Sequence, residues 1–541
     1  MPRIQYTKEG GKITWDKDDW LSGLHPQHQY GTTAVIKTHP SQSLYSNAVT
    51  PFRELGAVYP GYLPEAASNN SQVTSLLLNA VVNNTDAYFV SSGALVHKVT
   101  NITYPVSLET SSWPHTVTLG GGHAAHSSVA CEDIVLYNCN VGGTRKRCMF
   151  VSWNDNTDWD VAQYTFATAS TVWDDDFMST TPASPLASPY LTGGKGYPHP
   201  MIVGDDDILY VGSSNYVHAY DGGTGANGTF TAAALTLPAG FVVKSFAKIE
   251  NYLIVFAYYN NTNSSYLGQA KAYFWNYLDL DPTKVVDLDD NKVCAAFQYG
   301  ATVGCITAGN YAAGNSSSKP YRLRIWNGGE FQTVANFGGE EPVNGGIQVI
   351  EKGILINAGT KVFLYNSALV KPQIQELFQP FANTGSSAGL LKQIWIDTIV
   401  SSSGTTSSGG LELLNNDKYT TGSMLAPYSK PDFPLGKRGR VKAIRVQFHT
   451  AITASANKFQ LQIQTEQLSP HEIISSGDNV ISASTETMVR EYVLKQDGSA
   501  LPVFTALAPI LTWAVNDNTK LECLGVERIE IEFENVNYTV T

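Results

Sequence analysis

The sequence predicts an all-β protein whose central part is a β-propeller, with an extended N-terminal arm and a C-terminal β-sandwich or jelly-roll domain. Three observations lead to this prediction. Short runs of β-forming residues recur along the chain, an aromatic residue closes each copy of a two-armed unit, and the composition is rich in glycine and tyrosine while only 15% of residues are charged. Hairpins that repeat about every 50 residues are typical of propeller blades.

The clearest copy of the repeated unit lies between Val203 and Gly223. Three aspartates precede a run of β-forming residues from Ile208 to Val211, a polar turn follows, and the second arm ends at Tyr220. A nearly unbroken apolar arm indicates burial on both faces, whereas the alternating second arm indicates a position nearer an edge. The pattern therefore predicts a hairpin.

Seven copies of this unit are visible in the sequence. Their second arms end in aromatic residues, in most copies followed by Asn or Asp: Trp153, Tyr220, Trp275, Trp326 and Tyr365. An earlier copy begins at Tyr88 and a later one at Ile394. We therefore expect six to eight blades, with seven favoured. Because one blade cannot bury both of its faces, the closing aromatics are expected to fill the space between neighbouring blades.

Composition divides the chain into four segments. Residues 1–70 combine prolines and aromatic residues, and we expect an extended arm that lies over another surface. Residues 71–400 hold the repeats, and residues 401–436 have the serine, glycine and proline content of a linker. Residues 437–541 contain strands of strict period two, such as Arg528 to Asn535, which predict a small sandwich of two sheets.

The charge and the cysteines restrict the classes of function. A formal net charge of -12 argues against nucleic-acid binding by phosphate neutralisation, although an acidic wall would let DNA pass without sticking. The six cysteines are irregularly spaced and include no CxxC pair, so we expect reduced, mostly buried thiols. A pair within Cys131, Cys139 and Cys148 is the alternative. We expect no signal peptide and no membrane span, because no sufficiently long apolar run occurs.

Three features together resemble the β-propeller structural proteins of tailed-bacteriophage virions, such as tail nozzle, hub, stopper and minor tail proteins. They are the stretch SNAVTPFRELGAVYPGYLPE (Ser46 to Glu65), blades of the DDDILYVGSSNYVHAYDG kind, and a terminal β-domain. The resemblance covers most of the chain at the level of layout. It implies an oligomeric structural component of a phage tail or portal-proximal ring, assembled in the host cytoplasm and found in the virion. Its implied partners are copies of itself and neighbouring virion proteins, and DNA could pass through it without specific binding.

Several groups were considered for metal or catalytic chemistry. His123 and His126 form the single histidine cluster in a glycine-flanked stretch, and without a marked third ligand we expect ordinary loop residues. Aspartates gather at Asp158/Asp160, Asp174–Asp176, Asp205–Asp207, Asp279/Asp281 and Asp287/Asp289/Asp290. None matches the twelve-residue calcium loop, so we interpret them as solvent-facing turn residues, with Ca²⁺ binding as the alternative.

Recognisable catalytic motifs are missing from the sequence. Ser152 to Trp159 is a degenerate match to the Asp-box of sialidase-type propellers, and even a good copy of that box is a turn and not an active site. GxSxG, HExxH and GxxxxGK[ST] do not occur. We therefore expect a non-enzymatic protein with no cofactor.

The candidate interface residues are Lys437, Arg438, Arg440, Trp159 and Trp173. We expect the three cations to contact an acidic neighbour such as a second copy, with nucleic acid or solvent as alternatives. The two tryptophans belong to a second function, a receptor- or glycan-binding tail-tip module whose exposed aromatics stack on sugars. A less favoured third function is a propeller glycosidase or lyase that acts on host polysaccharide.

Overall fold

The computed structural model describes residues 129–309 except 156, 167–172 and 261–268. It also describes residues 7–9, 12–17, 45–47, 49–50, 58–60, 62–66, 77–91, 95–100, 321–336, 342–350, 353–358, 361–366, 373–378, 388–395, 398–405, 408–419, 422–425, 437–449, 458–465, 470–472, 480–481, 489–493, 503–504, 507–514 and 525–537. Within these ranges the protein is all-β, as expected. The described helices are the short α1 (Phe177–Thr180) and α2 (Tyr190–Gly193), and no described helix has the length and apolar character needed to cross a membrane.

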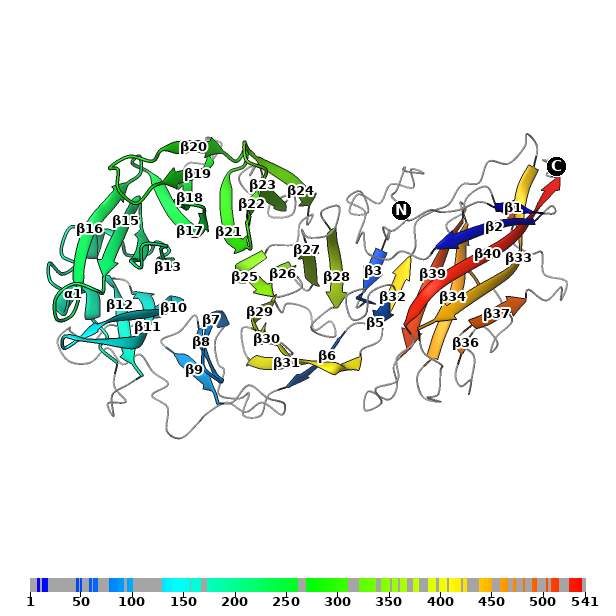
Figure 1. Ribbon diagram of the computed structural model, residues 1–541, viewed down its shortest axis with the longest axis horizontal. Coiled ribbons are helices and arrows are strands. Elements are labelled where there is room, and N and C mark those ends of the chain that lie inside the picture. The colour runs from blue at the N-terminus through cyan, green and yellow to red at the C-terminus, as the bar shows by residue number, and fades with distance from the viewer. Residues whose placement is uncertain are drawn as a thin grey trace. The chain divides into compact units, whose positions relative to one another are not determined.

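Small antiparallel sheets of three or four strands follow one another along the chain (Figure 1). The first two sheets are β7 (Leu77–Asn83), β8 (Asp86–Ser91), β9 (Val96–Val99), and β10 (Ala130–Val141), β11 (Thr144–Asn154), β12 (Trp159–Thr165). The next two are β13 (Met201–Val203), β14 (Leu209–Ser213), β15 (Tyr216–Asp221), β16 (Thr229–Thr236), and β17 (Phe241–Ile249), β18 (Tyr252–Tyr259), β19 (Ala270–Trp275), β20 (Lys284–Asp287). Strands adjacent in each of these sheets are adjacent in sequence, so each sheet is a meander that the local hairpin pattern can specify.

The same arrangement continues after residue 290. The following strands are β21 (Lys292–Tyr299), β22 (Thr302–Ala308), β23 (Tyr321–Trp326), β24 (Phe331–Asn336), then β25 (Pro342–Ile350), β26 (Gly353–Ala358), β27 (Lys361–Asn366), β28 (Gln373–Phe378). A further sheet has the order β29 (Ala388–Trp395), β30 (Thr398–Thr405), β31 (Ser408–Tyr419), β6 (Tyr62–Ala66). This succession of small sheets fits the predicted β-propeller.

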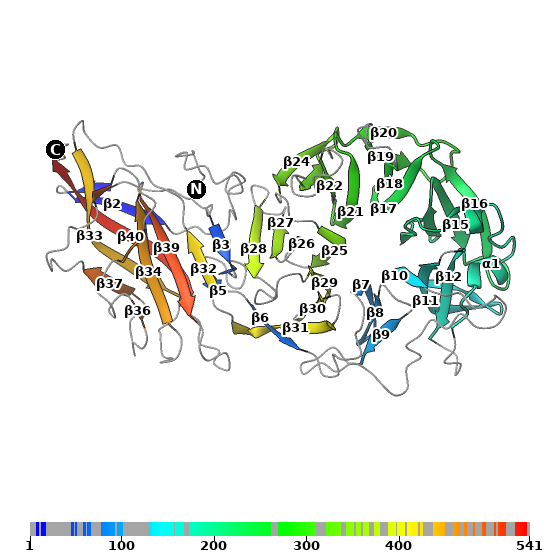
Figure 2. The same ribbon diagram turned by 180° about the vertical axis from the view of Figure 1, so that it is seen from behind.

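The chain forms two compact units. One contains residues 64–360 and 380–414, and the other contains residues 1–63, 361–379 and 415–541. In the larger unit, consecutive sheets pack face to face through shared apolar clusters. Figures 1 and 2 show the sheets from β7 to β24 following one another around a common centre.

The aromatics that close the hairpins lie at these sheet-to-sheet contacts. Trp153 packs with Tyr88 and Val90 of the preceding sheet, Tyr220 packs with Phe150, and Trp275 packs with Tyr210. All three closing side chains are buried. The prediction that they fill the space between neighbouring sheets is confirmed at these positions.

The first strands of the sheets surround the common centre of the larger unit. Strand β7 contacts β10, β10 contacts β13, β13 contacts β17, and the series continues through β21 and β25 to β29, which contacts β7. Four of these strands carry a β-bulge close to one end, and the residue left out of the ladder lies at position 78, 132, 244 or 294. A bulge adds one residue to a strand and re-aims its side chain, so a recurring bulge presents a chosen side chain toward the same place in each sheet.

The second unit contains two larger sheets. One has the order β1 (Thr7–Glu9), β2 (Lys12–Lys17), β40 (Val526–Asn537), β33 (Lys437–Phe448), β37 (Val489–Val493), and β38 (Val503–Phe504) also pairs with β33. The other has the order β3 (Tyr45–Asn47), β32 (Gly422–Leu425), β39 (Leu507–Ala514), β34 (Lys458–Thr465), β35 (Pro470–Glu472), and β36 (Val480–Ile481) also pairs with β34. A two-stranded sheet joins β4 (Val49–Thr50) and β5 (Tyr59–Pro60). Phe448 of the first large sheet contacts Phe459 of the second edge to face, with 5.3 Å between ring centroids.

The boundaries of the segments differ from the sequence-based expectation. Residues 1–70, expected as an extended arm, supply β1 and β2, which pair onto β40, and β3, which pairs with β32. Residues 401–436, expected as a linker, supply β31 and β32. The strands of these segments pair with partners far apart in sequence, which composition alone does not indicate.

Candidate functional site

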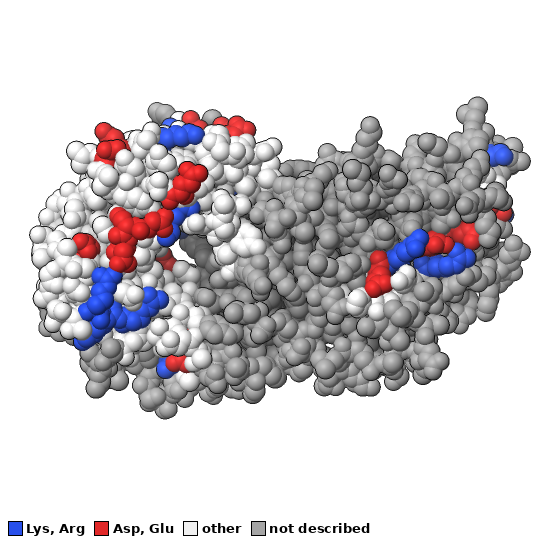
Figure 3. All heavy atoms as spheres, in the orientation of Figure 1, with Lys and Arg blue, Asp and Glu red and all other residues white. Residues whose placement is uncertain are grey.

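A cavity of ≈ 410 Å³ opens at the centre of the larger unit. Its walls come from the first strands β7, β10, β17, β21 and β25 and from the segment Pro198–Pro200, which precedes β13. In the space-filling view this face of the unit is hollowed, and charged side chains of both signs lie on the described surface (Figure 3). We call this the axial cavity.

The recurring bulges determine which side chains reach the axial cavity. The residues left out of the ladders of β10, β17 and β21 are Glu132, Lys244 and Cys294, and all three line the cavity. A carboxylate, an ammonium and a thiol from the first strands β10, β17 and β21 thus line one cavity. We did not predict these residues from the sequence. The signal was present, because each interrupts the alternation of its strand, although Lys244 and Cys294 lie closer to the end of their strands (Ile249 and Tyr299) than Glu132 does to Val141.

Glu132 is hydrogen-bonded on both carboxylate oxygens. One oxygen accepts from the Asn154 amide, and the other accepts from the backbone N–H of His199 at 2.5 Å and lies 3.0 Å from its Nδ1. Since His199 immediately precedes the next sheet, Glu132 links the β10 sheet to the β13 sheet. Charge-assisted hydrogen bonds of this kind are among the stronger polar contacts in proteins.

The residue that follows each bulge also reaches the next sheet. Asn79 donates to Asp133, Asp133 accepts from the backbone N–H of Met201 at 2.7 Å, and the Ser245 hydroxyl accepts from the backbone N–H of Ala296 at 3.1 Å. The same position therefore ties one first strand to its neighbour in three places. We call these residues the axial fasteners.

Lys244 is different, because its ammonium forms no hydrogen bond or ion pair with any residue in the described part of the chain. Burial lowers the pKa of Lys244, and the neighbouring charge of Lys292 lowers it further. Glu132, Cys294 and Asp133 act in the opposite direction without direct contact. A cation held in a cavity without a partner is the feature most open to a ligand.

The chain matches no family model and no curated protein. Among solved structures it is similar to the Dos1 propeller, at 11% identity over 65% of this chain and 96% of that one, with a TM-score of 0.38. It is also similar to an exo-β-1,3-galactanase from Phanerochaete chrysosporium (11% identity, 87% of this chain, 99% of that chain, TM-score 0.33) and to the computationally designed Ika8 protein (11%, 64%, 99%, 0.35). Likenesses at this level carry no argument about function.

Trp159 and Trp173 are buried, which corrects their expected place on an exposed rim. The Trp159 Nε1 donates to the backbone carbonyl of Tyr190 at 2.9 Å, so the segment around α2 covers the indole. Trp173 packs on Tyr164 with 5.3 Å between ring centroids. Neither side chain can stack on a sugar from solvent.

Lys437, Arg438 and Arg440 lie on β33, and Lys437 is exposed while Arg438 and Arg440 are half-buried. Their strand pairs with the acidic β40, where Arg440 stands opposite Glu534. Further along, Arg445 forms ion pairs with Glu530 and Glu532. For Arg445, on the same strand, the acidic partners lie within this chain.

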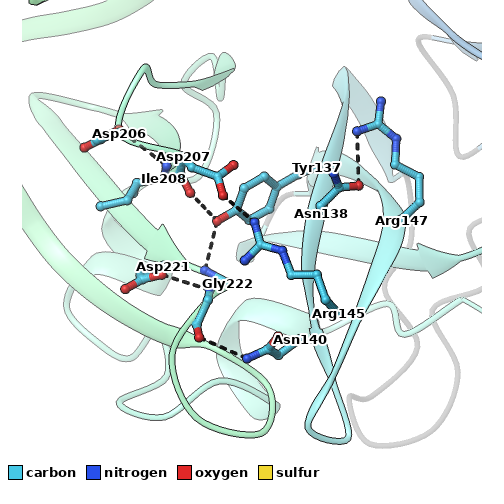
Figure 4. Close-up of polar contacts among 11 residues, drawn as sticks. Tyr137, Asn138, Asn140, Arg145, Arg147, Asp206, Asp207, Ile208, Asp221 and Gly222 are labelled. Atoms are coloured by element: carbon cyan, nitrogen blue, oxygen red, sulfur yellow. Dashed lines mark hydrogen bonds and ion pairs between the residues drawn. The ribbon is translucent and has the colours of Figure 1, made fainter.

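The aspartate groups divide into exposed and buried members. Asp205, Asp206 and Asp207 are exposed in the turn before β14, as expected, and Arg145 of the preceding sheet pairs with Asp207 (Figure 4). The Tyr137 hydroxyl donates to the carbonyl of Asp207 at 2.6 Å and accepts from the N–H of Gly222 at 3.0 Å. These contacts join two neighbouring sheets, so the turn has a structural role.

Asp155, Asp160, Asp175 and Asp290 are buried, and for Asp160, Asp175 and Asp290 this corrects the expectation of solvent-facing turn residues. Asp160 accepts from the backbone N–H groups of Val161, Met178 and Ser179. Among the residues described, no three His, Cys, Asp or Glu side chains are placed to hold a metal ion. His123 and His126 lie outside the described residues.

Two smaller expectations are confirmed. The degenerate Asp-box forms the turn between β11 and β12, where the Asp155 N–H donates to the Asp158 carbonyl at 2.9 Å. The five described cysteines are free thiols and buried. Cys139 and Cys148 are the nearest to a pair, with 3.4 Å between their sulfur atoms.

Proposed function

We propose that this chain is a structural component of a tailed-phage virion and acts as an oligomer in a tail or portal-proximal ring. The structural role is supported most directly by the hydrogen bonds that the acidic side chains of the axial cavity form. Glu132 and Asp133 are hydrogen-bonded to the neighbouring sheet and serve as fasteners. A carboxylate engaged in this way is poorly suited to general acid or base catalysis, which needs access to the substrate's proton. The arrangement suits a part whose task is mechanical.

We further propose that the small three- and four-stranded sheets form a seven-bladed propeller. The closed succession of first strands from β7 through β29 and back to β7 supports this count. So does β6, which precedes the first sheet in the chain and completes the sheet of β29, β30 and β31. Joining the two ends of a propeller in one sheet removes two free edges and resists opening of the ring.

We assign a β-sandwich to the two large sheets of the second unit, supported by the contact of Phe448 with Phe459. This unit also carries the candidate interface residues Lys437, Arg438 and Arg440. Because Lys437 is exposed on an otherwise acidic protein, it is suited to an acidic surface of a second copy or of a neighbouring virion protein. An acidic inner wall in such a ring would let DNA pass without binding it.

The mass of the purified full-length chain tests the assembly role. Light scattering and electron microscopy should find a closed ring of several copies, and Lys437→Glu should weaken it because the new charge repels an acidic partner. The exposed Lys195, changed to Glu, is the matched control and should leave the ring intact. A chain that stays monomeric at every concentration would contradict the oligomeric role, and its absence from purified particles of a phage that encodes it, by mass spectrometry, would contradict the virion role.

Two other functions have their own deciding experiments. If the chain is a glycan-binding tail tip, it should bind to a glycan array. The buried Trp159 and Trp173 cannot supply the sugar-stacking surface for this function. A glycosidase or lyase predicts depolymerisation of host polysaccharide by the purified chain. For the glycosidase or lyase, the described carboxylates of the axial cavity, Glu132 and Asp133, are already hydrogen-bonded to the neighbouring sheet.

A further inference from the structure

The axial cavity combines one unpartnered cation with several hydrogen-bonding groups. Lys244 and Ser245 both line the cavity, and the Ser245 hydroxyl accepts from the Ala296 N–H and can still donate its own hydrogen. The carboxylates of Glu132 and Asp133 line the same space. Each carboxylate oxygen has lone pairs for more than one donor, so both can accept hydrogen bonds from a ligand in addition to their fastener contacts.

The charges in the cavity restrict what kind of ligand fits. A bare anion would gain Lys244 but would be repelled by Glu132 and Asp133. A neutral sugar would gain the carboxylates but would leave Lys244 desolvated without a counter-charge, which is costly. A molecule with one carboxylate and several hydroxyl groups meets both demands, because its hydroxyls donate where the protein accepts and its carboxylate pairs with the ammonium.

The size and lining of the cavity agree with a small polar organic ligand. Its ≈ 410 Å³ lies within the range of pockets for small molecules. Ala130, Pro198 and Ala295 provide short apolar side chains between the polar groups, and such surfaces can contact the carbon face of a sugar ring.

We propose that the axial cavity binds a sugar acid of monosaccharide size, with its carboxylate on Lys244 and its hydroxyl groups on Ser245, Glu132 and Asp133. This goes beyond the proposed structural role and does not depend on it. The lowered pKa of Lys244 is consistent with a site built for a counter-ion, since a bound carboxylate would restore the charged form.

Titration calorimetry on the full-length chain with glucuronate, glucose and acetate tests this proposal. Glucuronate should bind, and glucose and acetate should each bind at least about tenfold more weakly, because each lacks half of the matching groups. Lys244→Met should reduce glucuronate affinity about tenfold or more, and Lys244→Arg should recover part of the loss. Lys195→Met, at an exposed lysine outside the cavity, should change nothing.

Three results would overturn the proposal: no glucuronate binding, equal binding of glucose and glucuronate, or unchanged affinity in Lys244→Met. Thermal unfolding of each variant shows whether it is folded, and Ser245→Ala provides a second variant with a smaller expected loss. The oligomeric state of the same samples is measured separately. Ring formation without glucuronate binding would reject the ligand alone, and binding by a monomer would reject the assembly role alone.

Discussion

The indole of Trp159 stacks on the imidazole of His199, with 4.3 Å between ring centroids and 16° between ring planes. Trp159 begins β12 and His199 precedes β13, so the stacked pair joins two neighbouring sheets. Both side chains are fully buried. The tryptophan therefore serves the packing of the sheets.

Replacing Trp159 with alanine should destabilise the protein by about 3–5 kcal/mol, because the change leaves a large cavity between two sheets. Urea unfolding followed by circular dichroism measures this. Trp326→Ala, at a half-buried closing aromatic, should cost less. Wild-type stability in Trp159→Ala would contradict the packing role.

The axial fasteners should contribute unequally to stability. Asp133 accepts from Asn79, Met201 and the Ile134 N–H, so Asp133→Ala should lower the free energy of unfolding by about 2–4 kcal/mol. Ser245→Ala removes one neutral bond and should cost about 1 kcal/mol. Chemical denaturation ranks the two, and the reverse order would show that the carboxylate is not a fastener.

A buried ionic cluster joins the strands of the β21 sheet. Asp290 accepts from Arg322, Thr307 and Arg324, whose Nη2 lies 2.9 Å from the carboxylate. Asp290→Ala would leave Arg324 buried without its counter-charge and should cost about 3–5 kcal/mol in a denaturant titration.

The control for this change is Asp287→Ala. Asp287 pairs with Lys271 at 3.2 Å, but its side chain is 67% exposed. Exposed ion pairs contribute about 1 kcal/mol or less. Equal losses in the two variants would show that burial of the Asp290 cluster is unimportant.

Stability should fall in acid because of His218. Burial lowers the pKa of His218 to about 3, with His199 as a second cause, and its Nδ1 accepts from the Ala233 N–H. An unfolded histidine takes up a proton near its ordinary pKa of 6.5, so between about pH 6.5 and 3 the unfolded chain binds more protons. The contribution of neutral His218 to the free energy of unfolding is complete above pH 6.5. It is lost as the pH falls, by about 1.4 kcal/mol per pH unit. His218→Asn should show a flatter dependence of unfolding free energy on pH in this window, and an unchanged slope would contradict it.

Asp160 should make the protein less stable as the pH rises, the opposite of the effect of His218. Burial raises the pKa of Asp160 to about 8, against an ordinary value of 3.8. The folded chain therefore holds a proton between these values that the unfolded chain releases, and this contribution is lost as the pH rises toward 8. Asp160→Asn keeps one oxygen to accept from Val161 and Met178, loses the acceptor for Ser179, and should gain relative stability at pH 8 over pH 5. Thermal unfolding at the two pH values measures the difference, and an equal difference in wild type would refute the assignment.

Local pattern was enough to predict the hairpins and their closing aromatics, because the partners of each strand are its neighbours in sequence. The burial of Trp153 and Trp275 could be predicted in this way. The pairing of Lys12–Lys17 with β40 could not be predicted in the same way, since nothing near those residues indicates a distant partner. Trp159 was expected on a rim because the segment that covers it, around Tyr190, has the composition of an exposed insertion.

The axial site was missed for a related reason. Glu132, Lys244 and Cys294 are of different chemical types, so no residue motif connects them. What they share is that each is the residue left out of the ladder at the β-bulge of a first strand. Comparing the first strands in register, and asking which residue breaks the alternation, would have found them.

The pairing of β2 with β40 has a consequence for how the protein is made. A ribosome releases residues 12–17 long before it produces residues 526–537, so the early strand must wait, uncovered, for its partner. During that interval it offers an open edge to other nascent chains or to a chaperone. Translation that stops before residue 526 would leave this strand without its partner in the chain.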